Sequence, residues 1–479
     1  MAFGVRLRRL PATVRTKQES LIMIHPAGEW NTPEVTGINR TLTHAPLGAW
    51  PDEAAARAGD PAASPFVLSL NGTWRFALTP SPEEMPAGFT TPATDDSDWH
   101  EIAVPGNWQL DEAVADQPIY TNMPYPFRDL PPAAPQVNPT GWYRTRFDLP
   151  AAWAGRRTFL LLESCDSACK VWVNGEFVGY SQDSKLPHEF ELTAALQPGT
   201  NHLAVMVPRY CDGFYLECQD YWHLSGIQRD VTLYSKPQAY LRDYCVQTVF
   251  DADYRDAELR VRAWMNEADD LADGYRVEAM LYNDAGDTVF DASVGAGVAL
   301  ASPMYGGDDA PVYTAADIRQ TVRAPSQWTA ETPTLYTLTL TLRDPRGEAV
   351  DFESCRVGFR QVEIRDRQLR VNGKRLIVRG VDRHEHHPHK GRALTRADMR
   401  REIVAMKQLN FNAVRTSHYP DHTVWYDLCD EYGIYVIDEA NLETHGIQAQ
   451  TTRDPAWMNA YLERAQRMAL RDRNHACVI

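Results

Sequence analysis

From Leu68 to about Pro237, apolar and polar residues alternate in short runs that turn residues separate, with no helical pattern between them. In residues 170–180 (KVWVNGEFVGY), two such runs flank Asn174-Gly175, a dipeptide that supplies the positive φ angles of a tight hairpin turn. Residues 202–207 (HLAVMV) add another strand. Many strands without helices indicate a sandwich or jelly roll, so we predict a jelly-roll β-sandwich over residues 66–238.

The first 65 residues show no such alternation and are rich in Pro and Ala, and we predict an irregular N-terminal segment over residues 1–65. The arm at its start is basic, with Arg6, Arg8, Arg9, Arg15 and Lys17, but no apolar stretch follows, so a secretory signal is not indicated. We interpret the arm as a disordered extension. The alternative is that Met23 is the true start.

A second region of strands runs from residue 239 to 360. Alternating patterns occur at 258–265, 275–282 and 335–342, and the connections between them are rich in Asp and Gly. The length and the number of strands predict a smaller, immunoglobulin-like β-sandwich.

The pattern changes after residue 360. Residues 375–381 (RLIVRGV) form a continuous apolar run, which is typical of a strand buried on both faces. Thr395 with Asp398 three residues later predicts a helix N-terminus, and Met399, Ile403, Met406 and Leu409 follow it at helical spacing. Strand patterns at 412–415 and 434–437 then alternate with helical patterns at 423–432 and 455–472, and Cys477 begins another strand.

Strands that alternate with helices indicate a parallel sheet. A complete (β/α)8 TIM barrel needs eight strands and ~250 residues, more than residues 361–479 supply. We therefore predict an incomplete TIM barrel over residues 361–479, truncated at the start of strand 4. Its open edges would leave apolar backbone exposed.

Composition narrows the range of partners. The chain has 64 acidic and 48 basic residues, a formal net charge of -16, which argues against nucleic acid as the main partner. No apolar run approaches the ~20 residues of a membrane helix. The eight cysteines contain no C-x-x-C pair, so we expect reduced thiols and a cytoplasmic protein.

Titratable residues follow each of the three predicted parallel strands. They are residues 382–388 (DRHEHHP), 416–419 (TSHY) and 438–445 (DEANLETH). One such segment alone would be interpreted as a surface loop. Three consecutive strands that end in this way predict a functional site, because function gathers at the carboxyl ends of parallel strands.

The same segments suggest a metal. The cluster around His384 does not match H-E-x-x-H, and on extended backbone His384 and His387 would point in opposite directions, so zinc is not favoured. Glu443 and His445, two residues apart, can converge on one ion, and we predict Mg²⁺ there rather than Zn²⁺. Glu439 and Glu443 both follow the strand predicted at 434–437. We assign Glu443 to the metal and Glu439 to the strand end, so the two do not form a pair of catalytic carboxylates.

Several long motifs carry a specific resemblance. They are 35–40 (VTGINR), 69–76 (SLNGTWRF), 120–126 (YTNMPYP), 212–220 (DGFYLECQD), 379–388 (RGVDRHEHHP), 412–420 (NAVRTSHYP) and 438–446 (DEANLETHG). From about residue 29 to the last residue, the chain resembles the large microbial β-galactosidases of glycoside hydrolase family 2. In that family the first sandwich is a sugar-binding domain and the barrel is catalytic.

This resemblance implies hydrolysis of terminal non-reducing β-D-galactose residues in β-galactosides such as lactose, by a retaining mechanism. It implies that His384 and His418 contact the sugar and stabilise the transition state. It places Asn122, Asp220, Arg415 and Asn441 at the substrate, Mg²⁺ at Glu443 and His445, and Na⁺ at Asp220. The family usually has Asn at the position of Asp382.

Retaining hydrolysis needs two carboxyl groups about 5–5.5 Å apart. Residues 471–479 (RDRNHACVI) resemble the family segment that leads into W-S-L-G-N-E, whose Glu is the acid/base, about seven residues beyond Ile479. We therefore expect this chain to lack both catalytic Glu residues and to be an inactive N-terminal fragment. For the full-length protein we expect a homo-oligomer; a complementing C-terminal polypeptide is the alternative source of the missing residues.

Two alternatives remain. A β-glucuronidase or β-mannosidase fragment of the same family is one, although a glucuronidase needs a cation for the substrate carboxylate and the H-E-H-H-P run favours galactose. The other is a non-catalytic carbohydrate-binding or assembly module, which would have no use for His and Glu residues at the strand ends.

Overall fold

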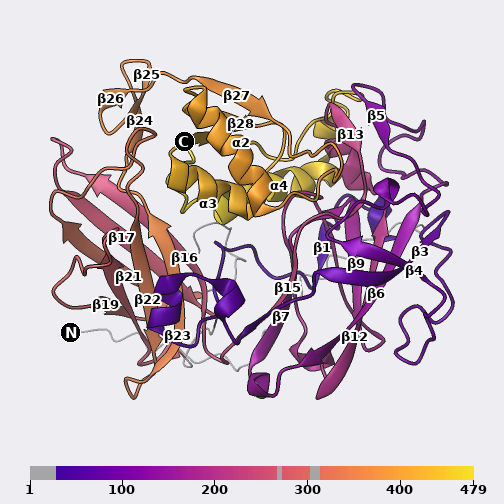
Figure 1. Ribbon diagram of the computed structural model, residues 1–479, viewed down its shortest axis with the longest axis horizontal. Helices are drawn as coiled ribbons and strands as arrows, with labels where there is room; N and C mark the ends of the chain where they lie inside the picture. Colours follow the sequence, from indigo (N-terminus) through magenta and orange to yellow (C-terminus); the bar gives the residue numbers. More distant parts are fainter. Residues whose placement is uncertain (1–27, 267–271, 302–312) are drawn as a thin grey trace, which may run out of the picture.

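The structure is a computed structural model that describes residues 28–266, 272–301 and 313–479. Two β-sandwiches lie on either side of a smaller unit of helices and parallel strands, drawn in orange and yellow (Figure 1). The basic arm predicted to be disordered lies outside the described residues. None of the helices in the described residues is both long and apolar enough to span a bilayer.

The first sandwich contains a seven-stranded and a four-stranded antiparallel sheet, with two short ribbons beside them. The larger sheet has the order β1 (Gly37–Ile38), β10 (Glu176–Gln182), β9 (Ala168–Val173), β12 (Gly199–Pro208), β6 (Thr140–Leu149), β3 (Gly72–Thr79) and β4 (His100–Val104). The smaller sheet has the order β11 (His188–Glu191), β7 (Arg157–Leu162), β15 (Val231–Lys236) and β2 (Val67–Ser69). The ribbons are β13 (Tyr221–His223) with β5 (Ile119–Thr121), and β14 (Gly226–Ile227) with β8 (Cys165–Asp166).

The predicted hairpin is present between β9 and β10. Asn174 and Gly175 form its turn with φ angles of 51° and 91°, which is why Asn-Gly serves there. Trp74, Trp108 and Val205 belong to the core between the two sheets. The jelly-roll prediction is confirmed.

Residues 28–65 run along both sandwiches with little regular structure. They contain the short helix α1 (Glu53–Ala58) and the 3-10 turns η1 (Glu29–Asn31) and η2 (Pro61–Ala63). The backbone N–H groups of Ala45 and Gly48 donate to Asp243 and Glu353 of the second sandwich. This segment therefore attaches the second sandwich to the first.

The second sandwich pairs two four-stranded antiparallel sheets. One has the order β16 (Leu241–Phe250), β17 (Ala257–Met265), β21 (Tyr313–Val322) and β20 (Ala299–Ala301). The other has the order β19 (Val294–Gly297), β18 (Arg276–Tyr282), β22 (Tyr336–Arg343) and β23 (Ala349–Val357). The ribbon β24 (Val362–Arg365), β25 (Gln368–Val371) and β26 (Lys374–Arg375) leads on to the parallel strands.

The third unit is a parallel β/α unit. Its strands β27 (Gly380–Arg383), β28 (Ala413–Thr416) and β29 (Tyr435–Ile437) alternate with the helices α2 (Arg396–Gln408), α3 (Thr423–Tyr432) and α4 (Met458–Asp472). Val478 forms a parallel bridge to Val436, so the segment that starts at Cys477 lies beside β29 as a fourth strand would. The predicted incomplete barrel is confirmed.

Local signals account for these helices. Thr395 and Asp398 form the predicted capping box of α2. Gly433 ends α3 with φ 73°, and a Cβ atom there would lie 2.5 Å from the Ala330 carbonyl oxygen. Met399 and Ile403 face the core as predicted, whereas Leu409 follows the last turn of α2 and is exposed.

The prediction of a buried strand over residues 375–381 is wrong. Only β26 and β27 are strands there, and Ile377 and Val378 between them are 57% and 45% exposed. The reason is that β27 is an edge strand of the described sheet, with β28 on one side and no strand of the described residues on the other.

Candidate active site

Two imidazoles face each other at the carboxyl ends of β27 and β28. The His384 and His418 rings have centroids 5.6 Å apart and planes at 83°. Two contacts hold these strand ends in place. The Arg383 side chain at the end of β27 pairs with Asp421 at 2.8 Å, and the Ser417 N–H just after β28 donates to the Arg383 carbonyl. The predicted convergence of these two residues is thus present.

His384 is held as a neutral imidazole. Burial lowers its pKa, and the charges of Arg392 and His418 lower it further, to about 4. Its Nδ1 lies 3.4 Å from the Tyr419 hydroxyl. At neutral pH the ring can therefore exchange hydrogen bonds with sugar hydroxyls without carrying a charge.

Glu439 organises the neighbouring side chains at the ends of β28 and β29. It accepts a hydrogen bond from Arg415, and its other oxygen lies 3.0 Å from Nδ1 of His418. Arg415 also lies 3.6 Å from Asp382, the position where the resembled family has Asn. Two carboxylates therefore offset the charge of Arg415. Glu439 also orients His418, a role that the sequence analysis, which assigned Glu439 to a strand end, did not predict.

The predicted metal ligands lie together in the loop after β29. Oε1 of Glu443 is 3.5 Å from Nδ1 of His445, and both side chains are partly exposed. The Glu443 N–H donates to the Leu216 carbonyl at 2.6 Å, which ties this loop to the first domain.

The donor set fits a hard divalent cation. Ligands of an octahedral Mg²⁺ ion lie about 2 Å from the metal and therefore about 3 Å from each other, so a small movement would let both residues bind one ion. No Lys or Arg in the described part of the chain pairs with Glu443.

The first domain brings Asp220 and Asn122 to this side. Tyr120 donates to Oδ1 of Asp220 at 2.7 Å across the β5–β13 ribbon. The Asp220 carboxylate lies close enough to His384 to oppose the lowering of its pKa. Asn122 follows β5 and is exposed. Asp220 is the residue expected to bind Na⁺, and that role stays a prediction.

Asn441 is placed differently from the other predicted residues. It is fully buried, its amide N–H donates to Asp183 at 2.9 Å, and its oxygen accepts from Gln219 at 2.7 Å. Its amide is thus occupied by first-domain side chains. In this structure Asn441 fixes the loop after β29 to the first domain rather than facing the other site residues.

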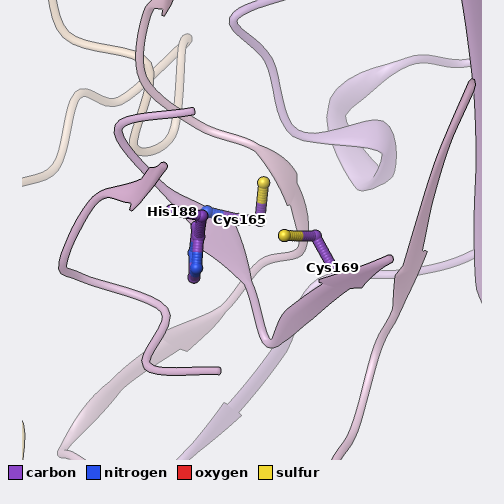
Figure 2. Close-up of side chains that lie close together, drawn as sticks. All are labelled: Cys165, Cys169 and His188. Carbon is purple, nitrogen blue, oxygen red and sulfur yellow. The ribbon is translucent and has the colours of Figure 1, made fainter. Parts of the chain in front are cut away.

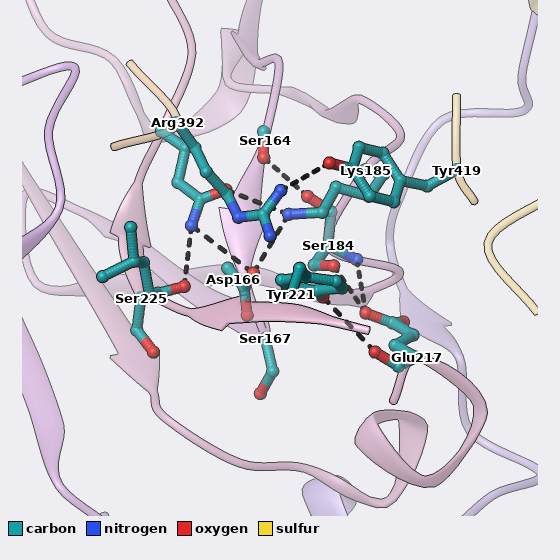
Figure 3. Close-up of polar contacts among 12 residues, drawn as sticks. Ser164, Asp166, Ser167, Ser184, Lys185, Glu217, Tyr221, Ser225, Arg392 and Tyr419 are labelled. Carbon is teal, nitrogen blue, oxygen red and sulfur yellow. Dashed lines mark hydrogen bonds and ion pairs between the residues drawn. The ribbon is translucent and has the colours of Figure 1, made fainter. Parts of the chain in front are cut away.

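A buried polar network lies beneath the site and joins the two domains (Figure 3). Arg392, from the loop after β27, donates to the Tyr419 hydroxyl at 2.7 Å and lies 3.8 Å from the centre of the Tyr221 ring. Lys185 of the first domain lies 3.1 Å from Asp166, and burial together with the charge of Arg392 lowers its pKa to about 8. Sequence periodicity gave no signal for these residues, because they come from distant segments.

A second connection supports Glu385. It pairs with Arg229 of the first domain at 2.7 Å, and both side chains are almost fully buried. Burial alone would raise the pKa of Glu385, but Arg229 and Arg383 hold it well below its usual range. The segment that carries His384 is therefore anchored to both domains.

A separate group of potential metal ligands lies in the core of the first sandwich: Cys165, Cys169 and His188, whose ligand atoms are within 4.8 Å of one another (Figure 2). His188 accepts the Cys165 N–H at 3.3 Å through Nε2, and its Nδ1 lies 2.7 Å from Oγ of Ser181. Burial raises the pKa of the Cys165 thiol. With both ring nitrogens engaged and the thiol protonated, the group is core packing.

A jelly-roll domain thus packs against the strand ends of a parallel β/α unit and brings Asp220 close to the facing imidazoles of His384 and His418. Three family models match in order: "Glycosyl hydrolases family 2, sugar binding domain" at residues 67–237, "Glycosyl hydrolases family 2" at 239–360, and "Glycosyl hydrolases family 2, TIM barrel domain" at 362–479. The chain belongs to glycoside hydrolase family 2.

Curated relatives are similar over nearly the whole chain. A β-galactosidase from Psychromonas ingrahamii is 45% identical over 459 residues, which are 95% of this chain and 43% of that protein. One from Enterobacter cloacae is 46% identical over 454 residues, 94% of this chain and 43% of that protein. The chain thus spans less than half the length of these relatives.

Solved structures share the fold at lower identity. The β-glucuronidase of Ruminococcus gnavus superposes with a TM-score of 0.70 at 22% identity, covering 87% of this chain and 66% of that one. That of Bacteroides uniformis gives 0.69 at 23% identity, covering 86% and 46%.

Proposed function

We propose that the complete protein hydrolyses terminal non-reducing β-D-galactose residues of β-galactosides, lactose among them, with retention of configuration. The observation that carries this is the pairing of neutral His384 with His418 at the strand ends, beside Asp220 of the sugar-binding domain. The curated β-galactosidases support the choice of sugar.

The electrostatics favour a neutral sugar over a glucuronide. A glucuronide carboxylate needs an available cation, and the charge of Arg415 is already offset by Glu439 and Asp382. The solved glucuronidases are related to this chain by fold.

Each residue has a chemical task in this proposal. His384 and His418 hydrogen-bond the sugar hydroxyls, and Glu439 holds His418 in place. Glu443 and His445 would hold Mg²⁺, which when bound supplies positive charge that tunes a neighbouring acid/base group. Asp220 would hold Na⁺ beside the sugar. Glu439 and Glu443 both have other partners here, so the two carboxylates of the retaining reaction come from outside these 479 residues.

We also propose a cytoplasmic setting and a homo-oligomer for the complete protein. All eight cysteines are free and six are buried, which suits a reducing compartment.

The test is a comparison of galactoside, glucuronide and mannoside hydrolysis by the protein from the completed reading frame. We expect galactoside turnover to dominate and His384→Ala to reduce kcat more than it raises KM, because transition-state contacts act on kcat. A preference for glucuronide or mannoside would overturn the assignment. The 479-residue chain purified from a host lacking β-galactosidase should show no turnover.

A further inference from the structure

Three hydrogen-bonding groups meet at the Tyr419 hydroxyl beneath His384. Nη1 of Arg392 lies 2.7 Å from the hydroxyl oxygen, the Glu385 backbone nitrogen 3.1 Å and Nδ1 of His384 3.4 Å. Figure 3 shows Tyr419 beside Arg392 in the buried network. Tyr419 is 0% exposed, so bulk solvent offers its hydroxyl no partner. The hydrogen bonds of this hydroxyl are therefore made with these three groups.

The direction of each hydrogen bond follows from a count of protons. A guanidinium and a backbone N–H only donate, whereas a phenol hydroxyl has one proton to donate and two lone pairs that can accept. Arg392 and Glu385 thus occupy both lone pairs of Tyr419, and the hydroxyl donates its proton to Nδ1 of His384. A proton on Nδ1 instead would put three donors on one oxygen and leave the buried hydroxyl proton without an acceptor, which is unfavourable.

The hydrogen bond at Nδ1 sets the tautomer of the His384 ring. Burial and the charge of Arg392 lower the pKa of His384, so the ring is neutral at neutral pH and carries a single proton. Since Nδ1 accepts from Tyr419, that proton is on Nε2. Within the described part of the chain, the hydrogen bond of His384 through its ring is the one at Nδ1, which leaves the Nε2–H available to a ligand.

We propose that Tyr419 is a positioning residue that holds His384 as the Nε2–H tautomer and so directs this N–H at an oxygen of the sugar. An Nε2–H donates and cannot accept, so the sugar oxygen that it meets serves as the acceptor. The 3.4 Å distance at Nδ1 is long, and such hydrogen bonds often shorten only when a ligand binds. This inference rests on the proposed function and deepens it, because it fixes the direction of the hydrogen bond between His384 and the sugar.

The test is nitrogen-15 NMR of the 479-residue chain labelled only in histidine, with two-bond proton–nitrogen correlations that separate protonated from bare ring nitrogens. The signals missing from His384→Gln assign His384 among the fourteen histidines. We expect a protonated Nε2 and a bare Nδ1 that accepts a hydrogen bond. Tyr419→Phe removes the donor and should move the Nδ1 resonance toward that of a nitrogen without a hydrogen bond.

Titration with galactose connects the tautomer to the sugar. Galactose should shift the Nε2–H signal of the wild type, and Tyr419→Phe should bind galactose about threefold to tenfold more weakly, as expected for the loss of one hydrogen bond. The control is Tyr426→Phe, which removes the hydroxyl of another fully buried tyrosine. That hydroxyl accepts from the Asp421 N–H and donates to Asp438. The control should leave the Nδ1 resonance of His384 and galactose binding unchanged.

The possible failures are distinguishable. A proton on Nδ1 of His384 in the wild type would overturn the proposal, even if Tyr419→Phe does not fold. An Nδ1 resonance that is the same in the wild type and in Tyr419→Phe would also overturn it, as would an equal change in Tyr426→Phe. If the tautomer is as stated but galactose leaves the Nε2–H signal unchanged, the sugar contact of the proposed function is overturned and the role of Tyr419 in holding the tautomer stands.

Discussion

At the scale of single residues, neighbouring charged side chains of the β/α unit and of the first domain set the charge states of the site. His384 is neutral because it is partly buried beside Arg392, while Glu385, the next residue, stays charged because Arg229 faces it. Two adjacent residues of one loop therefore have different charge states: His384 is neutral and Glu385 is charged. Arg392 comes from the same loop, whereas Arg229 belongs to the first domain.

Replacing Glu385 tests this support. Glu385→Gln leaves the Arg229 guanidinium buried without its counter-charge, and we expect a loss of about 3 kcal/mol in the free energy of unfolding. Urea unfolding measures it. The matched control is Asp366→Asn, which breaks the surface pair with Arg370 and should leave the unfolding curve unchanged. Equal effects of the two substitutions would contradict the importance of burial.

Mg²⁺ should stabilise the chain through Glu443. A ligand present at 100 times its Kd raises the free energy of unfolding by about 2.7 kcal/mol, and Glu443→Gln should remove that gain by taking away the carboxylate oxygen. Thermal unfolding with and without Mg²⁺ measures it, with Asp382→Asn as the control carboxylate. A Glu443→Gln protein that responds to Mg²⁺ like the wild type would exclude this metal site.

Sequence reasoning reached the strand-end residues but not those beneath them. His384, His418, Glu443 and His445 follow strands, and their position in the fold could be read from the pattern. Arg392 and Lys185 meet only through tertiary packing of two domains, which leaves no periodic trace in either segment. The buried position of Asn441 has the same cause.

At the scale of elements, the capping signal of α2 predicted the position of a helix end correctly, whereas the apolar run at 375–381 wrongly predicted a buried strand. The start of α2 follows from the predicted cap at Thr395, because this signal is local in the chain, and in the structure Gly433 ends α3. The apolar run at 375–381 carries no such signal. A run of that kind becomes a buried strand only if neighbours cover it, and the neighbours are not encoded in the run itself.

The segment after α4 depends on pH. Burial would lower the pKa of His475, but Asp430, 2.7 Å away, raises it to about 9. The pair therefore stabilises the fold fully below about pH 6.5, the unfolded value, and this contribution is lost as pH rises to about 9. We expect a loss of up to about 3 kcal/mol across that window.

The measurement is urea unfolding of the wild type and of His475→Gln between pH 6 and 10. The difference between the two should shrink as pH rises. His44 beside Glu189 has a pKa raised in the same direction, so the variant keeps part of the pH dependence. A difference that is constant with pH would contradict the assignment to His475.

At the scale of the whole molecule, we expect the exposed edge of the parallel sheet to promote self-association. Ile377 and Val378, just before β27, are exposed, and among the described residues β27 has a strand partner on one side only. Such edges pair with other chains. The double substitution Ile377→Lys with Val378→Lys should reduce association, measured by analytical ultracentrifugation. Leu409→Lys, which changes an exposed aliphatic residue beyond the end of α2, is the control and should have no effect.

The network around Arg392 has a consequence for heat inactivation. The residues that would meet the sugar stand on two separate hydrophobic cores. Buried polar contacts, such as those of Arg392 with Trp222 and of Arg229 with Glu385, join these cores together with an apolar cluster around Tyr215 and Trp457. Warming that loosens these contacts would separate Asp220 from His384 while every β-sheet stays intact. Loss of ligand binding would then precede the loss of circular dichroism, so a thermal scan that follows secondary structure alone would overestimate the temperature at which the protein still works.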